Sequence, residues 1–521
     1  MKSHSYQLVL LLALTFSLGK LSLFALTVNP LFSDYAVLQQ DKPIPVWGNS
    51  KPGETVSVTF GGRIGEAKAD GEGKWMVILD PLTGSMEPRS MKIQAGEIEI
   101  TLNEILVGEV WVGSGQSNMA WPVKASLDAD AVAKKAAVGG YPRIRLFKVP
   151  VDGSDLRDSS VNATWVLPTE AGVSSFSATA FYFAAKLAQD RNVPVGMIQS
   201  ANGGTNAFSW INNETLEADP AAETVRAYWS ATLKNHPAAM ERYKTQLDRW
   251  RRKSAAAKEK GEAFTDRAPS EPLGADHVKR PAGHYNAMIA PLQPYAIRGV
   301  IWYQGEANSR VPFNTGYNDL MTALVEDWRT DWSAASGGAL ERTDFPFYLV
   351  QLPNFAGGDP EGWPLIREQM LKFWQEGTNT GMVVTIDSGD AKDIHPANKT
   401  PVGERLAQFA RANTYGENIV YSGPIYDSLR IEENRAIVSF TEIGGGLASL
   451  NEEPLAEFEI AGADGKFVPA VASIQDDELV VTAESISEPR AVRYAWKSNP
   501  EAVNFGNKDG LPASPFRTDS W

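Results

Sequence analysis

The stretch VGEVWVGSGQSNM, residues 107–119, decides the fold class of this 521-residue chain. Its first part, 107–112, is mainly apolar, and continuous apolar strands are typical of a sheet that is covered on both faces. Its second part is a glycine-rich turn that ends in Ser117 and Asn118. A strand that stops at such a turn places the next side chains at the carboxyl edge of the sheet, where open α/β sheets bind their ligands.

Five further short apolar runs repeat the first part of this pattern. They lie at residues 144–149, 193–198, 297–303, 345–352 and 382–386. Helix-like segments separate or follow them, and Leu406, Phe409 and Ala410 have the spacing of an amphipathic helix. Strands that alternate with helices predict an α/β domain with a parallel sheet flanked by helices, which we place at 105–415.

Period-two patterns lie on both sides of this domain. Within 27–104, Val56, Val58 and Phe60 alternate with polar residues, and turn signals separate the runs, which predicts a β-sandwich. Within 416–521 the alternation returns, for example at 436–440 and 479–482. This predicts a second, C-terminal β-rich domain.

Residues 214–281 interrupt the α/β pattern and are predicted to be an insertion. Met240, Tyr243, Leu247 and Trp250 form one stripe of a helix. A basic cluster, 249–253, stands at the end of that stripe and indicates either the solvated end of an amphipathic helix or a basic binding site. Residues 253–281 are rich in Ala, Lys, Glu and Pro and predict a mobile insertion or a surface loop.

Composition excludes several classes of function. The chain has 49 Lys and Arg against 63 Asp and Glu, a net charge of -14, which argues against a nucleic-acid partner. It has no cysteine, so disulfides, zinc–thiolate sites, iron–sulfur clusters and a cysteine nucleophile are all excluded. The negative charge also favours a largely neutral ligand over an anionic one.

The N-terminus, residues 1–25, is predicted to be a secretory signal peptide, with cleavage after Ala25. Its apolar run, 8–18, is too short to cross a bilayer core of about 30 Å. A buried N-terminal helix or an uncleaved anchor is the alternative. Export of a chain without cysteine indicates a bacterial periplasmic or extracellular protein, and no later segment is predicted to span a membrane.

Ser117 is the candidate nucleophile, and a serine hydroxyl needs a base. The chain has five histidines, and only His395 follows the end of a predicted strand with a carboxylate, Asp393, close by. Such a carboxylate can orient the imidazole and stabilise its protonated form. The alternative is that Ser117 and Asn118 merely cap a helix and that His395 caps a turn.

Two further strand ends offer donors for an oxyanion hole. Gly203 and Gly204 follow the third predicted strand, and a glycine N–H can reach an oxyanion with no side chain in the way. Gln304 closes the fourth strand, and its amide is a second candidate donor. Both segments are otherwise ordinary strand-terminating turns.

Four short motifs together resemble the signature blocks of the sialate O-acetylesterase family of SGNH hydrolases. They are GQSNM at 115–119, GGT at 203–205, WYQGE at 302–306 and DIHP at 393–396. The resemblance covers nearly the whole chain after the leader. It departs at Asn202, where members of the family often carry Trp, and this puts the shape of the acyl or sugar pocket in question.

The resemblance implies Ser117 as nucleophile, His395 as general base and Asp393 as its orienting acid. It implies an oxyanion hole from the Ser117 N–H, a glycine at 203–204, with Gly204 favoured, and Gln304. It implies no metal and no organic cofactor.

The expected function is therefore that of a carbohydrate O-acetylesterase, which removes acetyl groups from sugars through an acyl-enzyme. Acetylated sialic acid and acetylated polysaccharide both fit as substrates. One alternative is glycoside hydrolysis by paired carboxylates, Glu306 with Asp387 or Asp390. Another is a catalytically silent glycan-binding protein whose 15 Trp serve as sugar platforms. Within the esterase, Glu306 either binds a sugar hydroxyl or supports its turn.

Overall fold

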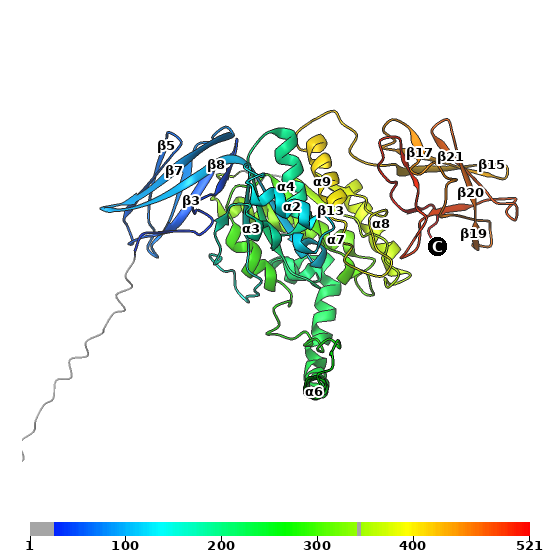
Figure 1. Ribbon diagram of the computed structural model, residues 1–521, viewed down its shortest axis with the longest axis horizontal. Helices are drawn as coiled ribbons and strands as arrows, with labels where there is room; N and C mark the ends of the chain where they lie inside the picture. The colour runs from blue at the N-terminus through cyan, green and yellow to red at the C-terminus, as the bar shows by residue number, and fades with distance from the viewer. Residues whose placement is uncertain (1–24, 341–344) are drawn as a thin grey trace, which may run out of the picture.

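The computed structural model describes residues 25–340 and 345–521. Apart from Ala25, the predicted signal peptide lies outside the described residues. The chain forms three parts in a row, a β-rich N-terminal part, a central α/β part and a β-rich C-terminal part (Figure 1). Within the described ranges, none of the helices is long and apolar enough to cross a membrane.

The central sheet confirms the predicted α/β class. Each of the six apolar runs forms a strand, and all six are parallel. A short antiparallel strand, β10 (Trp165–Val166), is added at one edge. The six parallel strands, in spatial order, are β9 (Ile144–Lys148), β11 (Val195–Ala201), β8 (Ile98–Gly115), β12 (Gly299–Tyr303), β13 (Phe347–Val350) and β14 (Thr380–Val383).

Helices cover both faces of this sheet, as β13 illustrates. Successive side chains of a strand point to opposite faces. Tyr348 packs on Phe409 of α9 (Thr400–Asn413), with ring centroids 4.8 Å apart. Its neighbour Phe347 packs on Trp328 and Phe373 of two helices on the other face. These are α7 (Tyr317–Ala335) and α8 (Gly362–Glu376), while α4 (Ala178–Arg191) lies beside α9.

The N-terminal part consists of two small sheets. One is β1 (Thr27–Val28), β3 (Ile44–Asn49) and β6 (Lys74–Leu79). The other joins β4 (Thr55–Phe60), β5 (Arg63–Lys68) and β7 (Ser85–Ala95) to the first half of β8. One further short strand, β2 (Val37–Gln39), pairs with β8 in parallel.

Strand β8 corrects the predicted boundary between residues 104 and 105. It runs unbroken through that position, and its side chains change from mainly exposed to fully buried at Ile105. One strand therefore serves both the N-terminal part and the central sheet, and the two parts share one hydrophobic core. The strand that ends at the candidate nucleophile is thus held along its whole length.

The C-terminal part is β-rich, as predicted. Its strands are β15 (Ile425–Glu432), β16 (Arg435–Thr441), β21 (Glu478–Thr482) and β20 (Val471–Gln475) in one sheet, β19 (Phe467–Pro469), β18 (Phe458–Ala461), β22 (Ala491–Tyr494) and β24 (Phe516–Arg517) in a second, and β17 (Leu447–Ser449) with β23 (Phe505–Asn507). Buried Arg367 of α8 ties it to the central part, since it donates to the Leu352 and Lys497 carbonyls at 2.8 Å.

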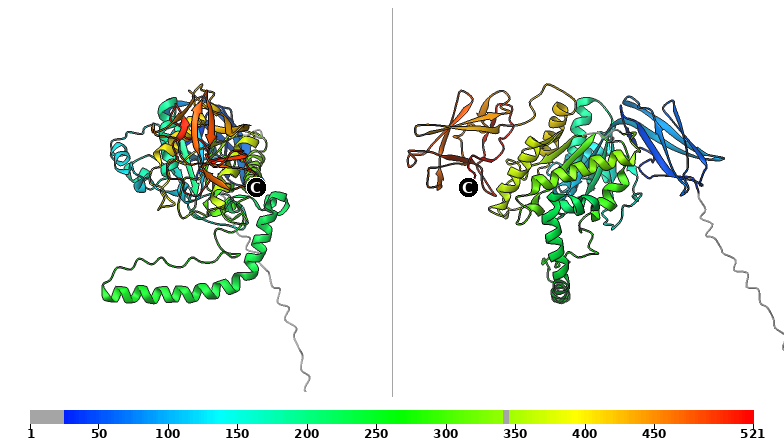
Figure 2. Two further views of the ribbon diagram at one scale, coloured as in Figure 1. Left: turned by 90° about the vertical axis from the view of Figure 1, so that its right-hand side faces the viewer. Right: turned by 180° about the vertical axis from the view of Figure 1, so that it is seen from behind.

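The insertion forms an arm, residues 223–275, that projects from the central part (Figure 1). Its helix, α6 (Glu223–Lys260), confirms the predicted stripe but ends later than expected, at Gly261 with φ of 70°. The basic cluster 249–253 therefore lies within the helix and not at its end, and the predicted loop is shorter. Pro237 lies inside the helix, which changes direction along its length before a return segment comes back beside it (Figure 2).

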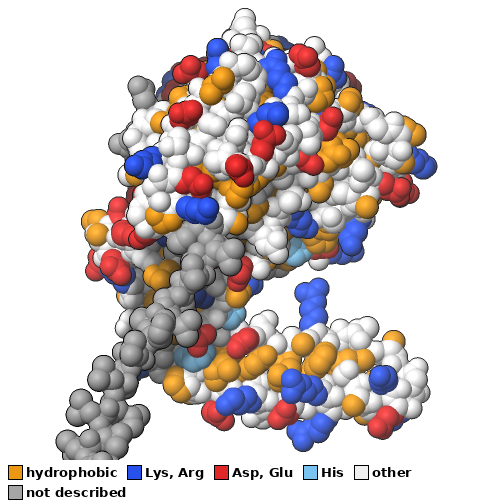
Figure 3. All heavy atoms as spheres, turned by 90° about the vertical axis from the view of Figure 1, so that its left-hand side faces the viewer, with side chains coloured by type: hydrophobic (Ala, Val, Ile, Leu, Met, Phe, Trp, Pro, Cys, Tyr) orange, Lys and Arg blue, Asp and Glu red, His pale blue; other side chains and the backbone are white. Residues whose placement is uncertain are grey.

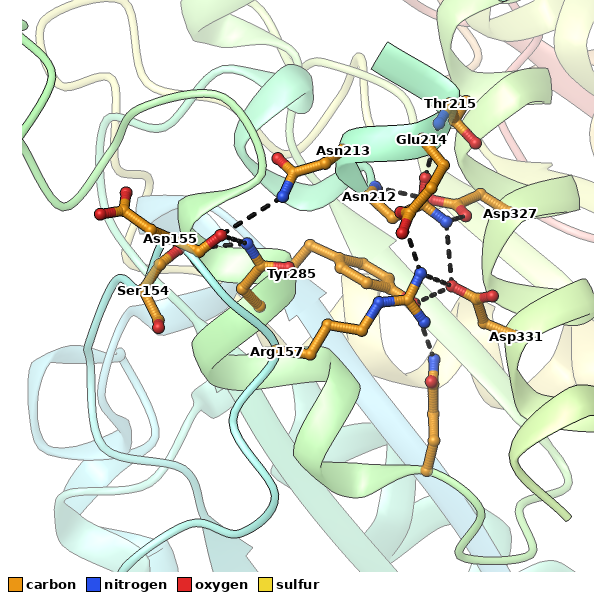
Figure 4. A network of polar contacts seen from close by, with 12 residues as sticks. Ser154, Asp155, Arg157, Asn212, Asn213, Glu214, Thr215, Tyr285, Asp327 and Asp331 are labelled. Carbon is orange, nitrogen blue, oxygen red and sulfur yellow. Dashed lines mark hydrogen bonds and ion pairs between the residues drawn. The ribbon is translucent and has the colours of Figure 1, made fainter. Parts of the chain in front are cut away.

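The root of the arm is anchored by a polar network (Figure 4). Arg157 forms ion pairs of 3.0 Å with Glu214 and with Asp331 of α7. Asn212, the N-cap of α5 (Asn213–Ala218), donates its backbone N–H to Asp327 at 2.7 Å. Burial raises the pKa of Asp327 to about 8.

Short α-helices of the central part that have not yet been named are α1 (Ser117–Ala120), α2 (Ala129–Ala137) and α3 (Glu170–Ser174).

Candidate active site

Ser117 lies at the carboxyl end of the central strand β8, as the sequence predicts, and is the first residue of α1. Gly115 shows why the turn is glycine-rich. Its φ is 130°, and a Cβ there would lie 2.2 Å from the Tyr303 carbonyl oxygen. The Gln116 N–H donates to that same carbonyl at 2.9 Å. The turn is therefore pressed against the end of β12, and the first N–H groups of α1 have no acceptor within the helix.

The Gly-Gly turn after β11 lies beside the candidate nucleophile. A Cβ on Gly203 would be 3.3 Å from the Ser117 Cβ, so only glycine leaves this approach open. Gly204 has a left-handed φ of 65°, and its outer side faces the Lys279 ammonium. Asn202, where the resemblance departs, turns its amide to His284 at 2.9 Å.

Gln304 corrects one expectation. It is fully buried, and its Nε2 donates to the Thr205 carbonyl at 3.1 Å and to Asn308 Oδ1 at 2.7 Å. Asn308 Oδ1 also accepts from the Ala207 N–H, which fixes the orientation of both amides. An amide nitrogen has two hydrogens, and both are used, so this geometry does not fit Gln304 as an oxyanion donor.

His395 lies in the loop between β14 and α9, again as predicted. Asp393 Oδ1 accepts from the His395 backbone N–H at 2.9 Å and lies 3.6 Å from the ring Nδ1. The second distance exceeds that of a hydrogen bond, so Asp393 acts on the imidazole mainly through its charge. Trp121 stacks on the His395 ring, with centroids 4.9 Å apart and planes 13° apart.

Asn118 joins the serine turn to the histidine loop. Its Nδ2 donates to the Ile394 carbonyl at 3.0 Å and to Glu306 Oε1 at 2.6 Å, and its Oδ1 accepts from Lys399 Nζ at 2.5 Å. The residue after Ser117 is thus bonded to the residue before His395. Because Trp121 of the serine turn also covers the histidine ring, the structure brings these two predicted residues to one edge of the sheet.

Sequence reasoning missed Lys399 and Trp121 and left the role of Glu306 open. Burial lowers the pKa of Lys399 to about 7 and raises the pKa of Glu306. Glu306 Oε2 is buried and has no hydrogen-bond partner among the described residues. Its other oxygen, Oε1, accepts from Asn118, so the carboxylate supports the serine turn from inside. The feature of the sequence that points to Lys399 is its position directly before Thr400 and Pro401, which are typical of the start of a helix.

We expect Lys399→Met to destabilise the fold by about 2 kcal/mol, because Asn118 Oδ1 loses its buried donor. Since the pKa of Lys399 is about 7, its amine is mostly uncharged at pH 8. Removing it at this pH therefore does not gain back the free-energy cost of burying a charge. Urea unfolding at pH 8 measures the change. Lys392→Met, in the same loop but exposed, serves as control, and equal stabilities of the two variants would contradict the assigned role.

The paired-carboxylate alternative is not supported by the positions of its residues. Asp387 forms a two-pronged ion pair with Arg405, both contacts at 2.6 Å. Asp390 accepts from the Lys392 N–H within its own loop, and Glu306 is bonded to Asn118. Each of these carboxylates is engaged in supporting the loops, and this alternative is therefore set aside.

A cavity of about 260 Å³ opens next to the Gly-Gly turn. Gly204 lines it, together with Lys279 and Arg310, whose charges face no carboxylate of the lining. Aromatic rings complete its walls, namely Phe208, Tyr228 and Phe313. The cavity has the mixed apolar and polar lining expected of a small-molecule site.

Comparisons with known proteins indicate the family of the chain. A family model described as "Carbohydrate esterase, sialic acid-specific acetylesterase" matches residues 274–411. The crystal structure of a carbohydrate acetylesterase from Xanthomonas citri is similar, with a TM-score of 0.78 and 34% identity over 95% of this chain and 100% of that one. The proteins called sialate O-acetylesterase in Mus musculus and Homo sapiens are 28% and 27% identical, over 93% and 95% of this chain and 92% of each relative. The similarity thus extends over nearly the whole chain.

Proposed function

Since this chain belongs to the family of sialic acid-specific carbohydrate esterases and is a carbohydrate O-acetylesterase, we propose that Ser117 and His395 carry out its reaction, assisted by Asp393. The observation that supports this proposal most is the contact between the two turns. Asn118 reaches the Ile394 carbonyl at 3.0 Å, and Trp121 lies on the His395 ring. No other described histidine lies beside this turn in a comparable way.

The reaction proceeds by acyl transfer. Ser117 Oγ attacks the acetyl carbonyl while His395 takes its proton, and the carbonyl oxygen becomes an oxyanion. When the intermediate collapses, the sugar oxygen leaves with the proton from His395, and the acetyl group stays on Ser117. Water then attacks this ester, again losing a proton to His395, and acetate and free Ser117 result.

The oxyanion is stabilised by backbone donors. The Ser117 N–H lies in the first turn of α1, where helix geometry provides no acceptor, and the turn at 203–204 supplies the second donor. Gly204 remains the proposed donor, with Gly203 placed against Ser117 to leave room for the substrate. Gln304 acts indirectly, because its amide fixes Thr205 and Asn308 behind this turn.

The substrate is an acetylated carbohydrate, as the family implies. The proposal also includes export by a signal peptide to the periplasm or the exterior, which the apolar run at 8–18 supports. Acetate release from a panel of acetylated sugars and glycans tests the substrate class directly.

The pH dependence tests the roles of His395 and Asp393. Burial lowers the pKa of His395, Lys399 and Arg267 lower it further, and Asp393 opposes them. A general base must be neutral, so we expect kcat/KM to fall on the acidic side with a midpoint below about 6.5. Asp393→Asn removes the charge that favours the imidazolium, which lowers this midpoint further.

Because Asp393 does not reach the ring within hydrogen-bond distance, the loss of activity in Asp393→Asn is expected to stay well below the ~10⁴-fold loss of a fully bonded triad. Asp390→Asn, in the same loop, is the matched control and should leave the midpoint unchanged. A midpoint that rises in Asp393→Asn would contradict the proposed electrostatic role.

A further inference from the structure

The arm lies beneath the central part and leaves a hollow between them (Figures 2 and 3). A basic side chain stands up from the arm into this hollow (Figure 3). The network at the root of the arm joins Arg157 and Asp331 of the central part to Glu214 at the start of the insertion. The arm is therefore anchored where it leaves the central part.

The arm is basic although the protein is acidic. Residues 223–275 contain 11 Lys and Arg against 7 Asp and Glu, whereas the whole chain has 49 against 63. Between helix α6 and the return segment lies a cavity of about 380 Å³ lined by Arg249, Trp250, Lys253 and Arg267. Its one carboxylate, Asp266, lies 3.5 Å from Lys253 Nζ and leaves the two arginines as excess positive charge. Arg249 and Trp250 lie four and three residues before Lys253, so both are neighbours of Lys253 on the helix surface.

The root of the arm lies beside the site, because Tyr228 and Leu273 of the arm line the same cavity as Gly204. Arg267 lies in the return segment of the arm, and its charge contributes to the lowered pKa of His395. At the root of the arm, the Lys279 ammonium lies 3.2 Å from where a Gly204 Cβ would be, and Arg310 lines the same cavity. Cations therefore lie both at the root of the arm, beside Gly204, and along the arm itself.

We propose that the arm and the face of the central part that carries Ser117 and His395 form a cleft for an acidic glycan several sugars long. The carboxylates of this glycan bind Arg267 and Lys253 on the arm, and Lys279 and Arg310 at its root. The inference rests on the proposed acetylesterase function and specifies its substrate. Tyr228 lines one cavity and Arg249 the other, and they are 21 residues apart along α6, so a ligand that fills both is longer than one sugar. The local charge outweighs the net charge of the chain, because charges beyond about 10 Å are screened in salt.

Three O-acetylated probes test the cleft, namely an oligogalacturonide, galacturonic acid monomer and a neutral xylo-oligosaccharide of equal length. We expect kcat/KM to be at least about tenfold higher for the acidic oligomer than for either other probe, and to fall steeply as NaCl is added. At pH 8, where His395 is neutral with or without the Arg267 charge, the double variant Lys253→Gln/Arg267→Gln should raise KM for the acidic oligomer about tenfold with little change in kcat.

Arg251→Gln is the matched control, because Arg251 lies on another face of α6 and pairs with Asp248. It should leave KM for the acidic oligomer unchanged. Equal rates on the neutral and acidic oligomers, or on monomer and oligomer, would overturn the cleft. A small acetyl ester separates the two proposals: if the wild type hydrolyses it through Ser117 but shows no preference for the acidic oligomer, only the cleft fails.

Discussion

Replacement of Ser117 by Ala is expected to reduce acetate release from acetylated sugars by at least about a thousandfold, the largest effect that we predict. The variant keeps the fold, because the side chain lost is one oxygen at a turn that Gln116 and Asn118 hold through their own bonds. What it removes is the atom to which the acetyl group is transferred. Binding of the sugar should change little, so the loss is expected in kcat.

Ser114→Ala is the matched control for this variant. Ser114 lies three residues earlier on β8, and its buried hydroxyl has no hydrogen-bond partner among the described residues. Its loss is therefore expected to leave both stability and acetate release nearly unchanged. Equal activity of the two alanine variants would exclude a serine mechanism at this turn.

Replacement of His395 by Ala is expected to cost about a thousandfold in kcat, since general base catalysis contributes roughly 10²–10⁴. The variant also removes the group that titrates, so the fall of activity on the acidic side should disappear along with the rate. Trp121 loses its stacked partner and becomes more exposed, and its fluorescence should report that change. His236→Ala is the control, because His236 is a half-buried histidine of the arm. With a small acetyl ester as substrate, this variant should still lose activity at acidic pH as the wild type does.

The parallel sheet and the strand ends that carry Ser117 and His395 are predictable from the sequence because they depend on short-range patterns. A parallel strand that is buried on both faces is apolar along most of its length, and a sharp turn at its end needs glycine. The six strands fit this pattern, although some carry polar residues, such as Arg145 in β9 and Gln199 in β11. Gly115 lies where a side chain would meet the Tyr303 carbonyl.

Three features were not predictable, each because it depends on long-range packing. The boundary at 104/105 lies inside β8, and nothing local shows that one strand serves two sheets. Gln304 is turned inward not only by nearby Asn308 but also by Thr205 and Tyr317, which come from other segments. The network of Lys399, Asn118 and Glu306 joins residues up to 281 positions apart.

The arm illustrates the same limit. Its helix was predictable from the stripe of Met240, Tyr243, Leu247 and Trp250, but the direction in which it projects was not. That direction depends on contacts such as the ion pairs of Arg157 with Glu214 and Asp331, which join residues far apart in the sequence. Net charge alone favoured a neutral ligand, whereas the local arrangement of charges favours an acidic one.

Trapping of the acyl-enzyme tests the central claim most directly. The enzyme is mixed with an acetylated sugar, quenched in acid within the first turnover, digested and examined by mass spectrometry. The account predicts one added acetyl group on the peptide that contains Ser117, formed before steady state and absent from Ser117→Ala. Acetate release at the wild-type rate with no acetyl group on Ser117, or with the group on another residue, would contradict it.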